Sequence, residues 1–452
     1  MSWFADSLGK RRPSNGWFNV NTDKILMLKM LMQRCACYKH AEVTYFNSIT
    51  YKSGFEFGSS YNKRTENNYL YLKIIDNNVL YHAHVSADIN KDSLSDIIDI
   101  ALMNPQLLCS IFDISTYELC NAYDRSIMND KSYYNVNATD LSSWVNDVRS
   151  KIISMNYGDL QLMSYVLEMH HLYYANSKCD AKETSGSSSI LQGAFLVRGS
   201  TNNYIPFHAC NVDPFSSVVD HLDLQNIDMR TGIYNNNYRQ LSGIIYISAD
   251  VMSRLTVGFV NAFNAACVID GSSFISSDDV YNSVFDNRVN LYDNPLSKYG
   301  YVRYGFDHEG SNTKIKCLLK KGVVNDLLSD SSTRIHYSNI TSGNCFRNNS
   351  DIGFSIMSTN PMLIISGSES TVSDSDYKID SYLDSFTFQS MFDIQSAKIK
   401  GVSFGRAVTD VGIEYCNYYM DLDIRVLFEK IIWIGKHKWL NGAYAPEVIC
   451  NL

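Results

Sequence analysis

The residues of this sequence best suited to chemistry lie in one short loop bounded by glycines. Asp307, His308 and Glu309 stand between Gly305 and Gly310, so two carboxylates and an imidazole occupy a segment that can turn sharply. Such paired carboxylates could orient a peptide amine or a loop of a partner protein. Such residues more often hold their own loop in place through hydrogen bonds. The sequence leaves both interpretations open.

The same loop contains the beginning of a zinc-peptidase motif. In such motifs a His-Glu pair is followed one helical turn later by a second histidine, which completes the pair of zinc ligands. Asn312 and Thr313 stand where that histidine would be needed. We therefore expect no metal at His308.

Two other pairs have the spacing of metal ligands on one face of a strand. They are His82 with His84, and His208 with Cys210. Neither pair has an evident third ligand, which a protein zinc site requires. The sequence therefore predicts no metal-binding residue in this chain.

The sequence also lacks a recognisable motif for a catalytic nucleophile. The segment Gly271–Phe274 contains two serines but not the G-x-S-x-G turn of a nucleophile elbow. His170 and His171 are adjacent in a strand-like run, so their side chains point to opposite faces and suit a half-buried strand. We predict no catalytic residue.

Composition limits the possible partners. The 452 residues carry a formal net charge of -8, which does not fit the basic surface of a nucleic-acid-binding protein. The most apolar early run, residues 25–32, is too short to cross a bilayer. We expect neither nucleic acid nor a membrane as a partner.

The cysteines indicate a reducing compartment. There are 11, an odd number, and no two are spaced as C-x-x-C. Scattered thiols in a long chain are typical of reduced, buried cysteines, and residues 1–20 show no apolar core of a signal peptide. We expect a cytoplasmic protein.

The elements that must position the loop follow from hydrophobic periodicity and length. A chain this long favours two domains. The sequence predicts an α+β fold: a flexible tail (1–20), an N-terminal sheet with packed helices (21–205) and a larger β-rich C-terminal domain (206–452). Helical spacing predicts helices at 22–37, 93–103, 141–155, 249–266 and 424–434. Alternating or apolar runs predict strands at 41–51, 69–85 with a break at 76–78, 165–169, 171–175, 189–198, 242–248, 315–319, 322–328, 362–366, 397–404 and 411–416. Residues 182–188 are polar and rich in serine, so we predict a loop there.

Several short segments recur in the order of a known family. They are Asp293-Asn294-Pro295, the Gly305–Gly310 loop, Leu318–Val323, Asp330–Thr333 and Thr341–Asn344. This order resembles the C-terminal domain of the TldD/PmbA peptidase family. His308, where an acidic residue is usual, and Ser342, inside a T-G-N segment, depart from the pattern. Gly271–Phe274 resembles the PmbA/TldE branch, while Tyr173–Ser177 and Gly435–Val448 resemble further family segments.

The resemblance also implies where chemistry should occur. The TldD branch carries H-E-x-x-x-H on the helix before the Asp293 turn, where two imidazoles hold zinc and the glutamate serves as base. The matching segment here, residues 249–266, contains no histidine and no glutamate. Cys416 and Cys450 lie where the family has a late cysteine ligand, and without histidines we interpret them as structural.

The resemblance therefore implies a non-catalytic, TldE/PmbA-like subunit of a heterodimeric zinc metallopeptidase that processes or degrades small, extended or modified peptides. The chain itself would hold no cofactor, zinc would sit in a TldD-like partner, and peptide could add a strand to a sheet edge. Peptide- or partner-binding residues are predicted at Asp307, His308, Glu309, Gly310, Gly343 and Asn344. Two alternatives stay open: a divergent peptidase active on its own, or a structural homodimer without peptidase activity.

Overall fold

The protein contains two sheets, one from each half of the chain. The computed structural model describes residues 16–56, 58–77, 79–86, 94–107, 138–154, 159–178, 181–196, 203–210, 232–233, 238–297, 304–334, 336–337, 339–347, 356–367, 377–386, 391–440 and 442–452. Within these residues one sheet has eight strands, another has twelve, and a third has two. The expected α+β fold is confirmed.

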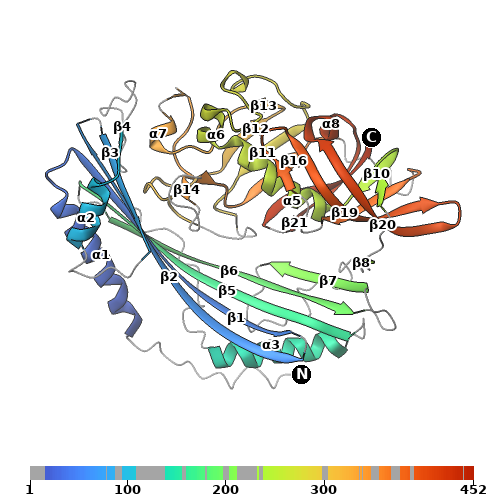
Figure 1. Cartoon of the computed structure of the whole chain (residues 1–452), viewed down its shortest axis with the longest axis horizontal. Coiled ribbons are helices and arrows are strands. Elements are labelled where there is room, and N and C mark those ends of the chain that lie inside the picture. The colour runs from blue at the N-terminus through green and yellow to red at the C-terminus, as the bar shows by residue number, and fades with distance from the viewer. Residues whose placement is uncertain are drawn as a thin grey trace, which may run out of the picture.

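The first sheet is antiparallel throughout and runs in the order β4-β3-β2-β1-β5-β6-β7-β8. Its strands are β1 (His40–Glu56), β2 (Ser59–Asp76), β3 (Val79–Val85), β4 (Pro105–Leu107), β5 (Asp159–Asn176), β6 (Ala181–Leu196), β7 (Asn203–Cys210) and β8 (Gly232–Ile233). The long strands β1, β2, β5 and β6 curve beneath the second half of the chain (Figure 1).

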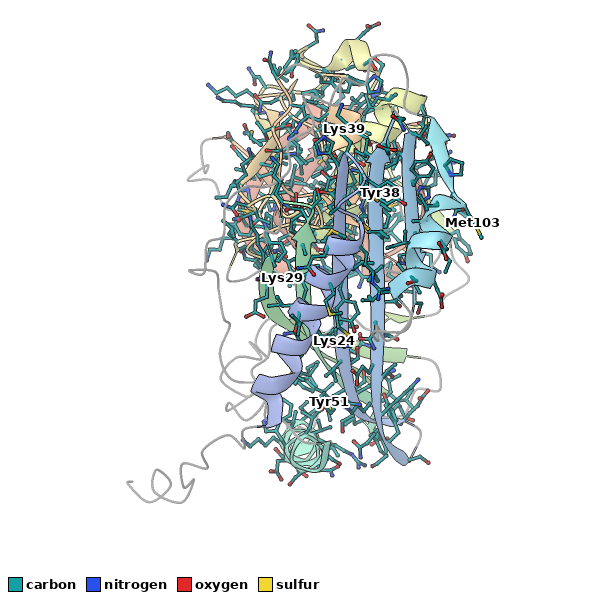
Figure 2. The ribbon with its side chains drawn as sticks, turned by 90° about the vertical axis from the view of Figure 1, so that its left-hand side faces the viewer. Lys24, Lys29, Tyr38, Lys39, Tyr51 and Met103 are labelled. Carbon is teal, nitrogen blue, oxygen red and sulfur yellow. The ribbon has the colours of Figure 1, made fainter. Side chains whose placement is uncertain are left out.

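The described helices of the N-terminal half lie on one face of this sheet. They are α1 (Gly16–Arg34), α2 (Leu94–Leu102) and α3 (Ala138–Ser154). Because side chains alternate along a strand, Val43 and Tyr45 of β1 pack with Leu28 and Leu31 of α1. Figure 2 shows α1 lying along the strands, with Lys24 and Lys29 on it. The even-numbered β1 residues point to the opposite face, toward the C-terminal half.

The second sheet runs in the order β13-β12-β11-β16-β22-β10-β17-β19-β20-β9, with β18 beside β19 and β21 beside β22. Its strands are β9 (Tyr238–Gln240), β10 (Ile244–Ile247), β11 (Val289–Asp293), β12 (Lys316–Lys320), β13 (Val323–Val324), β16 (Pro361–Ile365), β17 (Ser381–Phe386), β18 (Met391–Asp393), β19 (Lys398–Thr409), β20 (Gly412–Asp423), β21 (Ile431–Leu440) and β22 (Ala443–Asn451). The separate pair is β14 (Phe346–Arg347) with β15 (Ile356–Met357).

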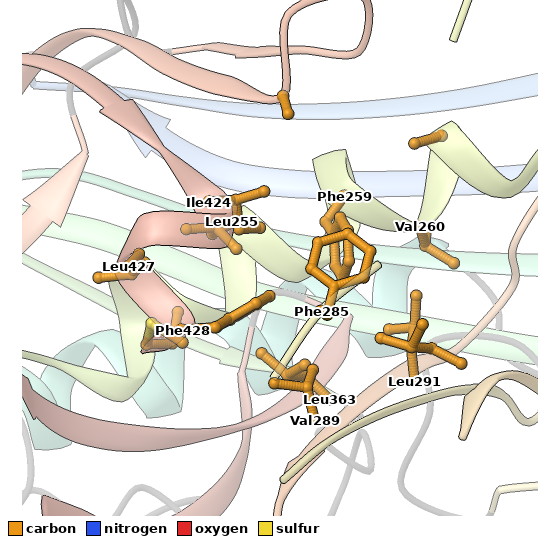
Figure 3. Close-up of a cluster of buried hydrophobic side chains, with 14 of the residues drawn as sticks. Leu255, Phe259, Val260, Phe285, Val289, Leu291, Leu363, Ile424, Leu427 and Phe428 are labelled. Carbon is orange, nitrogen blue, oxygen red and sulfur yellow. The ribbon is translucent and has the colours of Figure 1, made fainter. Parts of the chain in front are cut away.

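One helix organises the core of this half. α5 (Ala249–Val260) packs its apolar side onto the sheet. The other described helices of this half are short: η3 (Asn261–Phe263), α6 (Ala265–Asp270), η4 (Ser277–Asp279), α7 (Ser331–Arg334) and α8 (Ile424–Glu429). Phe259 is fully buried against Phe285 and Phe428, with ring centroids 5.3 and 5.7 Å away (Figure 3).

Two sequence expectations are wrong. Residues 182–188, expected to be a loop, belong to β6. They pair with β5, and Thr184, for example, stands opposite the buried Leu172. The last helix ends at Glu429 rather than at residue 434, because β21 begins at Ile431 and pairs with β22. Residues 431–434 are isoleucines and a tryptophan, which are enriched in strands.

The long helix expected at 249–266 is also divided. Asn261 ends α5, and Asn264 adopts an extended conformation and caps α6 by accepting a hydrogen bond from Ala266 N at 3.0 Å. The first sheet includes strands on both sides of residue 205, since β7 and β8 belong to it. The basic tail at residues 10–12 lies outside the described residues. Among the described helices, none combines the length and apolar character needed to cross a membrane.

Candidate functional site

Asp307 builds the Gly305–Gly310 loop from inside. Its carboxylate accepts hydrogen bonds from three backbone N–H groups: Glu309 at 3.0 Å, Ser311 at 2.9 Å and Cys345 at 2.9 Å. Its side chain is completely buried. Burial and the neighbouring Glu309 raise the pKa of Asp307 to about 7, although the three N–H donors act in the opposite direction.

His308 is held as a neutral imidazole. Its Nδ1 accepts a hydrogen bond from Arg347 N at 3.0 Å, so Nε2 carries the proton. Burial, and then the nearby Arg347 cation, lower the pKa of His308 to about 3. The backbone carbonyl of His308 accepts from Thr44 Oγ1 at 2.5 Å, which ties the loop to the first sheet.

Glu309 meets a lysine from the first sheet. Lys73 Nζ lies 3.2 Å from Glu309 Oε1 and 3.4 Å from Glu42 Oε1. Glu309 also accepts hydrogen bonds from Ser331 N and Ser331 Oγ, at 2.8 and 2.9 Å. The Lys73 side chain is only 3% exposed. A buried lysine therefore bridges one carboxylate from each half of the chain.

A second cation extends this network. Arg347 Nη2 lies 3.6 Å from Glu309 Oε1 and 3.5 Å from Asp330 Oδ2, and its guanidinium lies 4.6 Å from the ring centroid of Tyr71 on β2. Burial would raise the pKa of Asp330, but Arg347 and Lys73 outweigh it and hold that pKa well below its usual value.

Gly310 makes the closest approach to the sheet. It has a φ of +71°, and a Cβ built on it would lie 2.5 Å from Tyr174 Cε1. Lys182 Nζ donates a hydrogen bond to the Gly310 carbonyl at 2.8 Å. Glycine is needed here both for the left-handed backbone and for the contact with the Tyr174 ring.

Gly343 and Asn344 lie beside the loop rather than against the first sheet. Asn344 is fully buried and has a φ of +66°. Its Nδ2 donates to Asp293 Oδ2 at 2.9 Å and to the Lys314 carbonyl at 2.8 Å, and its Oδ1 accepts from Lys314 N at 3.1 Å. Asp293 belongs to the Asp-Asn-Pro turn, so these family-like segments hold one another in place.

The structure thus brings four of the six predicted residues, Asp307 to Gly310, to the contact between the two halves. We call this contact the interdomain joint; it comprises the Gly305–Gly310 loop, Ser331 and Arg347 on one side and the facing β1, β2, β5 and β6 residues on the other. Sequence reasoning missed Glu42, Lys73, Lys182 and Arg347. Lys73 carried a signal, because it is the one charge within the apolar run Leu70–Ile75.

Comparison with known proteins identifies the C-terminal half. Residues 244–399 match the family model of the PmbA/TldA metallopeptidase C-terminal domain, which contains the Asp293 turn, the Gly305–Gly310 loop and Asn344. This part of the chain carries the C-terminal domain of the TldD/PmbA family. The resemblance expected from motif order is confirmed.

Solved structures share the fold of this chain along nearly its whole length. TldE from Thermococcus kodakarensis has 12% identity and a TM-score of 0.71, and the alignment covers 94% of this chain and 98% of that one. Candidate modulators of DNA gyrase from Thermotoga maritima and Bacteroides thetaiotaomicron have 13% identity each, with TM-scores of 0.72 and 0.70. Those alignments cover 96% and 95% of this chain, and 99% and 98% of the others. No curated protein matches the sequence significantly.

α5 lies within residues 249–266, where the resemblance places the family's zinc-binding helix. Ser248 caps it by accepting a hydrogen bond from Val251 N at 3.3 Å, and Asp250 pairs with Arg254 at 3.5 Å. Its inner face is formed by Met252, Leu255 and Phe259. Within the described part of the chain, no three His, Cys, Asp or Glu side chains form a group that could hold a metal ion.

Two further histidines, His84 and His170, are packed among aromatic rings. His84 stacks on Tyr69 with centroids 5.8 Å apart, and burial lowers its pKa. His170 lies between Phe46 and Tyr304, at 6.0 and 5.4 Å. The side chains of His208 and Cys210 lie outside the described residues, so the prediction that this pair binds no metal stays untested.

Proposed function

We propose that this chain acts as the non-catalytic, TldE/PmbA-like subunit of a TldD/TldE-type zinc metallopeptidase. A TldD-like partner would supply the zinc and the catalytic glutamate, and the two chains would form a heterodimer. The substrates would be small peptides that are extended, unfolded or modified. The cysteine usage of the chain supports a cytoplasmic setting, where thiols stay reduced.

The observation that carries this proposal is the composition of α5 inside an otherwise complete fold. Zinc chemistry of this type needs imidazole ligands and a general base on one helix face. α5 places Arg254 and Val257 on its exposed side and has neither histidine nor glutamate. A helix of this kind can support a core, but it offers no ligand of the required type.

The interdomain joint disfavours independent catalysis by Asp307 and Glu309. The Asp307 carboxylate already accepts hydrogen bonds from three backbone N–H groups. Glu309 forms ion pairs with Lys73 and Arg347 and accepts a hydrogen bond from Ser331. A general base must reach a substrate proton. Carboxylates that are buried and already bonded within the chain suit the positioning of one half on the other.

Peptide recognition would then use a sheet edge. Both large sheets end in short strands, β4 and β8 in the first and β13 and β9 in the second. An extended peptide can add a strand at such an edge, where main-chain hydrogen bonds give affinity without demanding one sequence. This mode suits a protein that handles varied, unfolded peptides.

The test is zinc analysis and peptide cleavage on three samples: this chain alone, a TldD-like protein from the same organism alone, and the two co-expressed. We expect no stoichiometric zinc in this chain, and cleavage of an unstructured fluorogenic peptide that is strongest in the co-expressed sample and abolished by a chelator. Stoichiometric zinc together with chelator-sensitive cleavage by this chain alone would overturn the proposal.

A further inference from the structure

Two lysines stand directly opposite each other on the first sheet. Lys52 of β1 pairs in register with Lys63 of β2, and both side chains are exposed. Directly opposed residues of an antiparallel pair point to the same face, with Cβ atoms about 5 Å apart. Like charges placed in this way destabilise the strand pair unless a negative charge lies between them. We call Lys52 and Lys63 the lysine pair.

The nearest neighbours of the lysine pair carry no charge. The next cross-strand pairs on the same face and the β5 residue opposite Lys52 are all neutral: Thr50, Thr65, Gly54, Tyr61 and Val166. The pair is therefore not neutralised by the residues that flank it in the sheet.

Two carboxylates lie farther away on this face. Glu56 is four residues along β1 from Lys52, about 13 Å away. Glu168 lies diagonally from Lys52 on β5, and its Oε1 is 3.9 Å from His170 Nδ1. Within the described residues, neither carboxylate forms an ion pair with Lys52 or Lys63. The positive charge of the lysine pair thus stays available to a ligand.

Tyr61 is held beside Lys52 by a glycine. Lys52 Nζ lies 5.5 Å from the centroid of the Tyr61 ring. A Cβ built on Gly54 would lie 2.7 Å from Tyr61 Oη and 2.8 Å from its Cζ. The ring can lie across β1 because residue 54 has no side chain. The Tyr61 hydroxyl is therefore a further hydrogen-bond donor close to the lysine pair.

The lysine pair lies on the face of the sheet that is turned toward the C-terminal half. The register of β1 with β2 is unbroken, so Lys52 shares its face with the other even-numbered residues of β1, among them Glu42 and Thr44 of the interdomain joint. α1 packs on the opposite face. A ligand on the lysine pair would therefore lie on the same face as the joint.

Charge complementarity makes a carboxylate the fitting ligand. The chain has a net charge of -8, so most of its surface repels negative groups. Two adjacent ammonium groups and a phenol hydroxyl can instead all donate to one carboxylate. Peptides of varied sequence have in common only their main chain and their two termini. A protein that handles many such peptides can therefore recognise the C-terminal carboxylate, which each of them carries.

We propose that the lysine pair binds the C-terminal carboxylate of a peptide that lies on this face of the first sheet, with Tyr61 donating to the same group. The inference rests on the proposed function for the class of ligand, a peptide, and adds the group by which that peptide is held.

The experiment measures the binding of fluorescent peptides to the full chain by anisotropy. Two peptides share one unstructured, uncharged sequence and an N-terminal label, and they differ only in a free C-terminal carboxylate or an amide. We expect the carboxylate peptide to bind at least about tenfold more tightly than the amide. Lys52→Gln and Lys63→Gln should each weaken its binding about tenfold and leave binding of the amide unchanged.

The matched control is Lys29→Gln, which removes an exposed lysine from α1 on the other face of the sheet (Figure 2). This variant should bind both peptides as wild type does. All three lysines are exposed, so circular dichroism should show folded proteins. A third peptide, amidated but with one glutamate at its centre, tests the other source of a carboxylate, and we expect it to bind as weakly as the plain amide.

Four results would overturn the inference: equal binding of the carboxylate and amide peptides, no measurable binding of either, wild-type affinity in both glutamine variants, or tight binding of the glutamate peptide. The last would assign the lysine pair to acidic side chains. Failure of the proposed function is distinguishable, because it is read from zinc and cleavage. A chain that prefers the free carboxylate through Lys52 and Lys63, but supports no cleavage with a TldD-like protein, would contradict the proposed function alone.

Discussion

At the residue scale, single buried charges decide how the two halves meet. Lys73 lies in an apolar strand and has carboxylates from Glu42 and Glu309 within 3.4 Å. A buried ion pair adds little net stability, because desolvation offsets its attraction. Removing one member is nevertheless costly, because the remaining charges stay buried without compensation.

Lys73→Met is therefore expected to lower the free energy of unfolding by about 3 kcal/mol. Lys63→Met is the matched control, because Lys63 lies on the same strand but is exposed, and it should change stability by no more than about 0.5 kcal/mol. Urea denaturation of the two variants and wild type measures the difference. Equal stability of the two variants would contradict a bridging role for Lys73.

Two buried imidazoles give the protein a predictable response to acid. Burial lowers the pKa of both His170 and His308 to about 3. The unfolded chain binds a proton at each as pH falls below about 6.5, whereas the folded chain does not. The contribution of the two neutral imidazoles to the free energy of unfolding is therefore complete above pH 6.5. It is lost as the pH falls toward 3, at about 1.4 kcal/mol per pH unit for each imidazole.

His170→Phe is expected to reduce this pH dependence by about 1.4 kcal/mol per pH unit between pH 6 and 4. A phenyl ring can take the place of the imidazole between Phe46 and Tyr304. Urea midpoints measured across this range give the slope, with His336→Phe, which removes an exposed imidazole, as control. If His170→Phe keeps the wild-type slope, His170 is not buried in its neutral form.

At the element scale, the Gly305–Gly310 loop is shaped by what it touches. Gly310 and Gly271 have nearly the same φ, +71° and +75°. A Cβ at Gly310 would lie 2.5 Å from the Tyr174 ring, whereas nothing lies within 4 Å of a Cβ at Gly271. An alanine at either position would strain the backbone, but only an alanine at Gly310 would also collide with the first sheet.

We expect Gly271→Ala to cost about 1 kcal/mol from backbone strain, and Gly310→Ala to cost about 3 kcal/mol because the loop must also move away from Tyr174. Thermal denaturation of both variants checks the difference. Hydrogen exchange should also rise at the amides bonded to Asp307 in Gly310→Ala alone. Equal destabilisation would mean that the loop does not press on the first sheet.

At the scale of the whole molecule, the interdomain joint couples two sheets that each have their own core. Phe46 and Tyr174 of the first sheet pack with Tyr304, Phe306 and Phe346 of the second half. The buried network lies beside this aromatic cluster. The two halves should therefore unfold together, since apolar burial and paired charges are lost in the same step.

A double-mutant cycle across the joint tests this coupling. Lys73→Met and Glu309→Gln should show an interaction energy of about 1–3 kcal/mol. The control cycle uses Arg64 and Glu66, an exposed pair 2.9 Å apart within one strand, which should give less than about 1 kcal/mol. Additive effects at Lys73 and Glu309 would show that the joint does not couple the halves energetically.

Periodicity and motif order were enough to predict the α+β fold and the family. The helices of the first half were placed within a few residues except for the start of α1, because their apolar spacing reflects burial on one face. The absence of histidine and glutamate from the α5 segment was also readable directly. Each of these features depends on residues that are close together in the chain, so local sequence patterns are enough to predict it.

The partners of the loop could be decided only by tertiary structure. Lys73 and Glu309 are 236 positions apart, and no local pattern states that a strand lysine will bridge them. Residues 182–188 look like a loop by composition, yet they form a strand because each of them pairs with a residue of β5. Long-range packing and pairing override local preference, since burial and main-chain hydrogen bonds outweigh differences in intrinsic propensity.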